Sequence, residues 1–218
     1  DELLVQVFNG DGTEASTVKT DSVRAYAKRI LAAASSNAEI KQLAVDMLNY
    51  GAAAQNYFGY NTSDLANSIL TVAEKALATQ TTPTCTNIKA STGDYYHASS
   101  VSFESKIEMN IYLKNITLSN IDRLEATYND HYGNPKTVNV YANELRQSGS
   151  YYIATITSLV AADVRVPVTF KLYNKAGQVI TTVTESVESY VKRAEATSVN
   201  TLTKELMKFA DSAYAYFH

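Results

Sequence analysis

The side chains that most often carry out catalysis are few in this chain of 218 residues. It holds three histidines, His97, His131 and His218, and one cysteine, Cys85. No His-Glu-x-x-His, Cys-x-x-Cys or Gly-x-Ser-x-Gly spacing occurs, so zinc-hydrolase and serine-nucleophile sites lack their residues. A glycoside hydrolase needs two carboxylates across a cleft, and no pair of Asp or Glu stands out. We therefore predict no catalytic residue, no metal site and no cofactor, and interpret the protein as not an enzyme.

Aromatic side chains are the more informative group, because the chain holds 16 tyrosines and no tryptophan. A sugar ring presents flat patches of C–H groups that stack on aromatic faces, while its hydroxyls bond to amide, carboxylate and cationic side chains. Tyrosines with apolar neighbours on predicted helices and strands are interpreted as packing residues. Tyrosines in polar loops are the candidates for binding a ligand.

The first candidate group lies at the tip of a predicted hairpin over residues 128–136. It combines two tyrosines with an acid and a histidine: Tyr128, Asp130, His131 and Tyr132. Aromatic side chains on a loop have little core to join, which favours a ligand-binding role for these four residues.

Two further groups are the second choice. Tyr95 and Tyr96 are adjacent at the start of a predicted strand, so their side chains face opposite ways and at least one of them lies outside the core. Tyr60 and Asn61 follow a glycine that ends a predicted helix, where a turn role for Asn61 is an equal alternative.

Charge and composition exclude several classes of protein. The net charge is −3 and no cluster of Lys or Arg occurs, which argues against nucleic-acid binding. No apolar run approaches about 18 residues, so we predict no membrane span. Thr, Ser and Asn total 58 of the 218 residues while charged residues make up only 19%. This polar composition with a lone cysteine favours an extracellular protein of an anaerobic or Gram-positive bacterium.

The elements that must position these side chains change type along the chain. A hairpin is predicted over 3–19, followed by helices over 21–34 and 36–58 and a third helix beginning at 61–63. The polar stretch 79–84 is the predicted domain boundary. From 87 to 184 the apolar residues alternate with a period of two, which predicts six to eight strands of a β-sandwich. Two helices, over 186–194 and 201–217, end the chain.

A repeat runs through this order of elements. Phe8-Asn9-x-x-Gly12 matches Tyr173-Asn174-x-x-Gly177, and Ser22-Val23-x-x-Tyr26-x-Lys28-Arg29 matches Ser186-Val187-x-x-Tyr190-x-Lys192-Arg193. We predict an α+β fold, a β-sandwich with flanking helical clusters, in which a unit of hairpin plus helix pair occurs twice. The expected division is a first lobe over 1–82, with a hairpin and three helices, and a second lobe over 83–218, with a sandwich over 85–184 and a helix pair over 185–218.

The residues 22–61 carry a family resemblance, above all the run Asp46-Met47-Leu48-Asn49-Tyr50-Gly51-Ala52-Ala53-Ala54-Gln55-Asn56-Tyr57-Phe58-Gly59-Tyr60-Asn61. Together with 165–217 they resemble modules of surface proteins of gut clostridia and ruminococci, among them the starch adherence system proteins of ruminococcal amylosomes. The resemblance implies a β-sandwich with helices, and capture of α-1,4-glucan in a groove between them. It assigns no binding residue, because the shared motif is largely helix core.

Two interpretations remain open from the sequence. The first is a non-catalytic carbohydrate-binding module that binds α-1,4-glucan, starch or maltooligosaccharide, as part of a larger multi-module protein on the cell surface of a Gram-positive gut bacterium. The alternative is a structural spacer or adhesion domain of a bacterial surface protein that has no sugar ligand.

Overall fold

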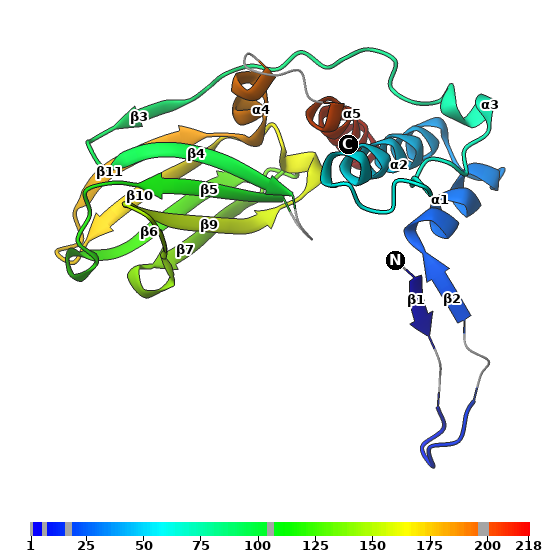
Figure 1. Ribbon diagram of the computed structural model, residues 1–218, viewed down its shortest axis with the longest axis horizontal. Helices are drawn as coiled ribbons and strands as arrows, with labels where there is room; N and C mark the ends of the chain where they lie inside the picture. The colour runs from blue at the N-terminus through cyan, green and yellow to red at the C-terminus, as the bar shows by residue number, and fades with distance from the viewer. Residues whose placement is uncertain (1, 6–7, 16–18, 104–106, 196–200) are drawn as a thin grey trace. The chain divides into compact units, whose positions relative to one another are not determined.

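The computed structural model describes residues 2–5, 8–15, 19–103, 107–195 and 201–218 (Figure 1). The chain forms two compact units, of which unit 1 comprises Asp1–Thr82 with Lys204–His218 and unit 2 comprises Pro83–Thr203. The division after Thr82 falls in the polar stretch that the sequence marks as a boundary. Residues 204–218, which the sequence analysis assigned to the second lobe, group instead with unit 1.

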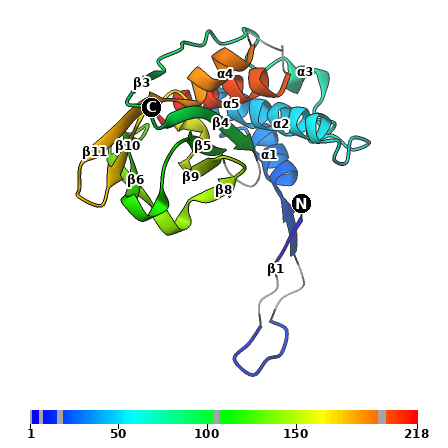
Figure 2. The ribbon, with the colours of Figure 1, turned by 60° about the vertical axis from the view of Figure 1, so that its left-hand side comes forward.

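Unit 1 combines a hairpin with helices. Its strands pair antiparallel, with Leu3 opposite Asp21 and Val5 opposite Lys19. In Figures 1 and 2 the hairpin extends away from the helices of this unit. The elements are β1 (Glu2–Val5), β2 (Lys19–Ser22), α1 (Val23–Ala32), α2 (Ala38–Phe58), α3 (Val72–Lys75) and most of α5 (Thr201–Phe217).

The ends of these helices follow from side-chain caps. The hydroxyl of Ser22 accepts a hydrogen bond from the backbone of Ala25 at 3.0 Å, and Asn37 caps α2 in the same way through Ile40. Gly59 ends α2 in the left-handed conformation, with φ 66°, which glycine adopts without strain. The helices bury a core of Ala27, Leu31, Ala44, Val45, Leu48 and Leu70.

The third predicted helix is wrong over most of its length, because residues 61–70 form turns and α3 spans only Val72–Lys75. Asn61 has φ 46°, a left-handed conformation that cannot begin a right-handed helix. Four-residue turns follow, in one of which the backbone N–H of Ser68 donates to the carbonyl of Leu65. Thr71 then starts α3 through a capping box with Glu74.

Unit 2 is built on two antiparallel sheets, with five strands in the order β3-β11-β10-β6-β7 and four in the order β4-β5-β9-β8. Figures 1 and 2 show the two sheets as adjacent layers. The strands are β3 (Ala90–Thr92), β4 (Tyr96–Phe103), β5 (Ile107–Leu113), β6 (Ile121–Asn129), β7 (Pro135–Tyr141), β8 (Arg146–Ser148), β9 (Tyr151–Leu159), β10 (Val168–Asn174) and β11 (Val179–Glu185).

Alternation along the strands explains the core of unit 2. Val168, Phe170 and Leu172 of β10 are buried, while Thr169 and Lys171 between them are partly exposed. Helix α4 (Val187–Glu195) directly follows β11, and short 3₁₀ helices lie at Leu118–Asn120, Ala142–Glu144 and Ala161–Asp163.

The described chain is therefore α+β, with two larger antiparallel sheets, a separate two-stranded hairpin and five α-helices. Among the described residues, no helix is long and apolar enough to cross a membrane.

Candidate functional site

The predicted hairpin tip is a real turn between β6 and β7, and Asp130 holds it together. The Asp130 Oδ1 atom accepts hydrogen bonds from the backbone N–H groups of Tyr132 at 3.0 Å and Asn134 at 2.8 Å. Its Oδ2 atom pairs with Lys136 Nζ at 3.2 Å. Burial opposes ionisation, yet the hydrogen bonds from Asn134 and Lys136 outweigh it and lower the pKa of Asp130. Both carboxylate oxygens of Asp130 therefore bond to groups of this hairpin.

His131 is likewise held by the protein itself. Its backbone N–H and its ring Nδ1 both lie within hydrogen-bond distance of Asp163 Oδ1, at 2.8 and 2.7 Å. Asp163 is buried, and the imidazole packs against the ring of Tyr132 with centroids 4.1 Å apart. Tyr132, whose side chain is 56% exposed, is the member of this group with the most accessible ring.

Tyr128 and Tyr96 do not offer an open ring face. Tyr128 is only 7% exposed, and its hydroxyl donates to Ser158 Oγ at 2.8 Å. Tyr96 is 8% exposed, and its hydroxyl donates to Ser99 Oγ at 3.3 Å. The Lys89 Nζ atom lies over the Tyr96 ring. Both rings are packing residues, which argues against their predicted stacking on a ligand.

Tyr95, in contrast, borders a cavity. Its half-buried side chain lies just before β4, and its backbone is anchored on both sides: the N–H lies 3.4 Å from Thr181 Oγ1 and the carbonyl accepts from Lys114 at 2.8 Å. The cavity has a volume of about 570 Å³, within the usual range for ligand pockets. Most of its lining comes from the 115–121 segment after β5 and the turn between β10 and β11.

The polar side chains in this cavity are available to a ligand. Asn115, Thr117, Ser119 and Asn120 are exposed there, and within the described part of the chain their side chains make no hydrogen bond. Of the described residues that line the cavity, Lys175 alone is charged, and its backbone N–H donates to the carbonyl of Asn120 at 3.0 Å. This arrangement of one aromatic ring with amides and hydroxyls suits a neutral polyhydroxylated ligand.

A glycine fixes the approach of Tyr95 to this cavity. Gly93 has φ +82°, and a Cβ atom there would lie 2.5 Å from the carbonyl oxygen of Ile180 and 2.6 Å from Thr181 Oγ1. Only glycine permits both that conformation and that approach to β11. The turn before Tyr95 is therefore set by close backbone packing.

Tyr60 and Asn61 belong to unit 1. Tyr60 is highly exposed, and its backbone N–H closes the end of α2 on the carbonyl of Gln55. The carbonyl of Asn61 accepts from Asp64 and from the Gln55 side chain. The backbone of Asn61 thus serves the turn, as in the alternative role that the sequence left open.

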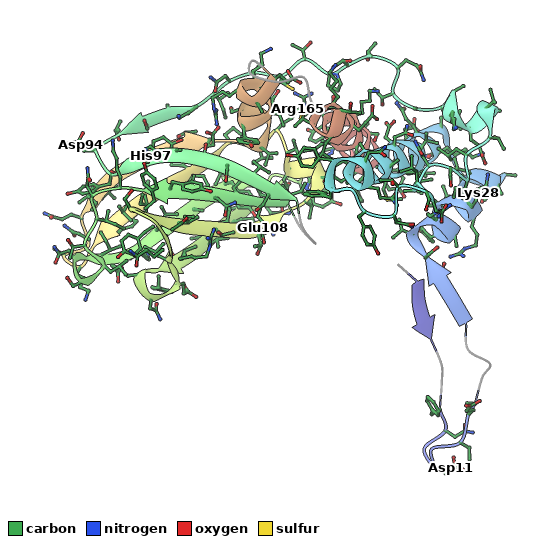
Figure 3. All side chains as sticks on the ribbon, in the orientation of Figure 1. Asp11, Lys28, Asp94, His97, Glu108 and Arg165 are labelled. Atoms are coloured by element: carbon green, nitrogen blue, oxygen red, sulfur yellow. The ribbon has the colours of Figure 1, made fainter. Side chains whose placement is uncertain are left out.

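A further aromatic group in the four-stranded sheet lies outside the residues predicted for the site. The exposed ring of His97 stacks on Tyr151, with centroids 4.2 Å apart and an interplanar angle of 12°, and Tyr112 meets Tyr151 edge-on at 6.5 Å. These residues stand where β4 begins, β5 ends and β9 begins; Figure 3 shows His97 at one end of the sheets and Glu108 toward the other. Their sequence signal was the pair Tyr151-Tyr152 after a turn.

Comparison with known proteins identifies no relative. No family model, curated protein or solved structure matches this chain significantly. In the part of the chain that the structure describes, no group of three or more His, Cys, Asp or Glu side chains is placed to hold a metal ion. The function must therefore be argued from the chain's own residues.

Proposed function

We propose that this protein is a non-catalytic carbohydrate-binding module for α-1,4-glucan, and that the cavity beside Tyr95 is its binding site. The observation that carries the proposal is the set of unpaired polar side chains around that ring: Asn115, Thr117, Ser119 and Asn120. A glucose residue stacked on Tyr95 would present its hydroxyls to these groups. Among the described residues, no carboxylate lines the cavity, which fits capture of a sugar better than its hydrolysis.

The charge of the cavity supports a neutral ligand. A phosphorylated ligand would need several cationic partners, whereas the described lining offers one charged residue, Lys175. Affinity should therefore depend little on salt. From one stacked ring and several hydrogen bonds we expect a dissociation constant in the micromolar range, which is a binding free energy of about −8 kcal/mol.

The polar, Tyr-rich composition and the resemblance to amylosome proteins support placing this module outside the cell. We propose a location on the surface of a Gram-positive gut bacterium, as one part of a larger protein. The partner is then starch or a maltooligosaccharide.

We also propose that the two sheets of unit 2 form a β-sandwich and that its last hairpin and helix are repeated in unit 1. Leu3 faces Asp21 in β1–β2 as Val168 faces Glu185 in β10–β11. Each hairpin turn has an equivalent backbone hydrogen bond. The N–H of Asn9 donates to the carbonyl of Thr13, and the N–H of Asn174 donates to the carbonyl of Gln178. These equal registers at an offset of 164 or 165 residues support a common origin.

An ion pair and a cap recur at the same offset. Arg29 pairs with Asp21 through two hydrogen bonds of 3.1 and 2.7 Å, and Arg193 pairs with Glu185 through two of 3.2 and 2.5 Å. Ser22 and Ser186 each accept a bond of 3.0 Å from the backbone three residues later. Matching contacts of this kind support the repeat independently of the strand register.

Affinity gel electrophoresis tests the proposed function. The protein should be retarded in gels containing soluble starch and unaffected by xylan or β-glucan. Asn115→Gly should weaken retardation, because it removes one amide while glycine keeps the φ of 56° without strain. Tyr132→Ala, at the hairpin tip, is the matched control and should be retarded like the wild type. Retardation that Tyr132→Ala abolishes and Asn115→Gly leaves intact would place the site at the tip.

The alternative, a structural spacer with no sugar ligand, makes the opposite prediction. No polysaccharide would then retard the protein at any concentration. That result would overturn the proposal and leave the cavity as an unused surface feature.

A further inference from the structure

The two hairpin–helix junctions differ in what covers them. In unit 2, Glu185, Ser186 and Val187 are buried, with relative exposures of 0%, 0% and 1%. The equivalent residues in unit 1 are Asp21, Ser22 and Val23, and Val23 is 61% exposed. The strand register and the serine cap are equivalent in the two junctions, so we attribute the difference in exposure to their neighbours.

The cover in unit 2 is a strand layer. Ser99 of β4 donates to Glu185 Oε2 at 2.7 Å and accepts from Arg193 Nη2 at 3.1 Å. The segment before β3 contributes as well, because Asn87 accepts from Arg193 Nη1 at 3.1 Å. Strand β11 is also flanked by β3, and β10 by β6. The junction of β11 and α4 thus has partners from β4, from the segment before β3 and from the neighbouring strands, and it is buried.

In unit 1 the start of the equivalent helix, α1, is exposed. Within the described residues, β1 and β2 pair with no third strand, and an isolated two-stranded hairpin is marginally stable. Beside it lies a groove of about 530 Å³ that is lined chiefly by apolar side chains of α1 and α2. Val23 and Tyr26, both more than half exposed, form one wall of this groove, and Asp21 and Ser22 lie at its polar margin.

We infer that the outer edges of β1 and β2, with the start of α1, form a docking surface for a β-sandwich of the kind that unit 2 contains. The partner presents an open strand edge to the hairpin, as β3 and β6 do in unit 2. It also presents a hydroxyl to the Asp21–Arg29 ion pair, as Ser99 does to Glu185–Arg193. The inference rests on the proposed repeat and is independent of sugar binding.

A graft within the full chain tests this fit. Residues 3–30 replace residues 168–194, while Glu188 and Ser189 are retained because their partners Arg165 and Ile88 belong to the recipient. The grafted chain should unfold in a single cooperative transition of its β-sheet signal, and the backbone amides of the grafted strand should become protected from hydrogen exchange. A second graft carries Lys19→Val, because Lys19 stands where the recipient has the buried Val183.

Val23→Lys is the matched control. In the natural chain this exposed residue should tolerate lysine with an unchanged melting temperature, whereas in the graft the same substitution should abolish the cooperative transition. If neither graft folds, or if Val23→Lys has the same effect in both contexts, the inference is overturned. Sedimentation velocity tests whether a second copy of the chain occupies this surface instead. If the natural chain is a dimer that Val23→Lys dissociates, a second copy and not a β-sandwich partner binds there, and the inference is overturned.

Discussion

Glu74 joins α3 to α1, and replacing it with glutamine should destabilise unit 1 in a pH-dependent way. Lys28 Nζ lies 2.7 Å from both Glu74 carboxylate oxygens, and the backbone and hydroxyl of Thr71 donate to Oε2 at 2.7 and 2.9 Å. The bond from Lys28, followed by the bond from Thr71, lowers the pKa of Glu74 from 4.5 to about 2. Glu74 is therefore ionised in the folded state over almost the whole accessible pH range.

The magnitude follows from this change in pKa. Without screening by solvent, the lowered pKa of Glu74 would correspond to about 3 kcal/mol of stabilisation. The Lys28 and Glu74 side chains are 38% and 19% exposed, so screening reduces the stabilisation to about 1 kcal/mol. Because the folded-state pKa lies below the unfolded-state value, this stability is present above pH 4.5 and is lost as the pH falls toward 2.

Urea unfolding of the wild type and of Glu74→Gln measures the effect. The difference in free energy of unfolding should be about 1 kcal/mol at pH 7 and should shrink steadily between pH 4.5 and pH 3. Glu14→Gln is the control, because this exposed carboxylate lies at no helix end and makes no ion pair with any described residue. A difference that stays constant from pH 7 to pH 3 would refute the reasoning.

Three other substitutions or reactions test the packing of unit 2. Glu185→Gln should cost about 2 kcal/mol in urea unfolding, because it weakens the charged hydrogen bonds that the buried Glu185 accepts from Arg193 and Ser99; a loss below about 0.5 kcal/mol would contradict this. Tyr128→Phe should cost about 1 kcal/mol through the lost hydrogen bond to Ser158, with retardation by starch unchanged; reduced retardation would return Tyr128 to the binding site. Cys85 should resist iodoacetamide at pH 8 in the folded protein, because burial raises the pKa of its thiol to about 11; rapid labelling without unfolding would show that the thiol is accessible.

The strands were largely predictable because alternation is a local property. The same alternation also held the information that Tyr128 is buried, since Leu124, Ala126 and Tyr128 share one face of β6 and all three are buried. The prediction that Tyr128 is an exposed loop residue was wrong because it did not use this periodicity. Asp130 and His131 were correctly placed at the hairpin tip, but their partners within the protein could not be read from composition.

The cavity beside Tyr95 lies beyond sequence reasoning for a physical reason. Its lining joins the 115–121 segment with the turn at 174–176, and they meet because β10 pairs with β6. That pairing depends on the strand order of the sheet, which local alternation does not encode. The third helix is shorter than predicted for a similar reason, because the left-handed conformation of Asn61 belongs to the turn that closes α2.

Isothermal titration calorimetry with maltoheptaose tests the central claim most directly. The wild type should bind with a micromolar dissociation constant. Tyr95→Ala should weaken binding roughly tenfold through the lost stacking and burial, and Asn115→Gly severalfold through one lost hydrogen bond. Tyr132→Ala should bind like the wild type. Absence of heat from the wild type at millimolar sugar would contradict the assignment of this cavity as the glucan site. So would Tyr95→Ala and Asn115→Gly variants that each bind as tightly as the wild type.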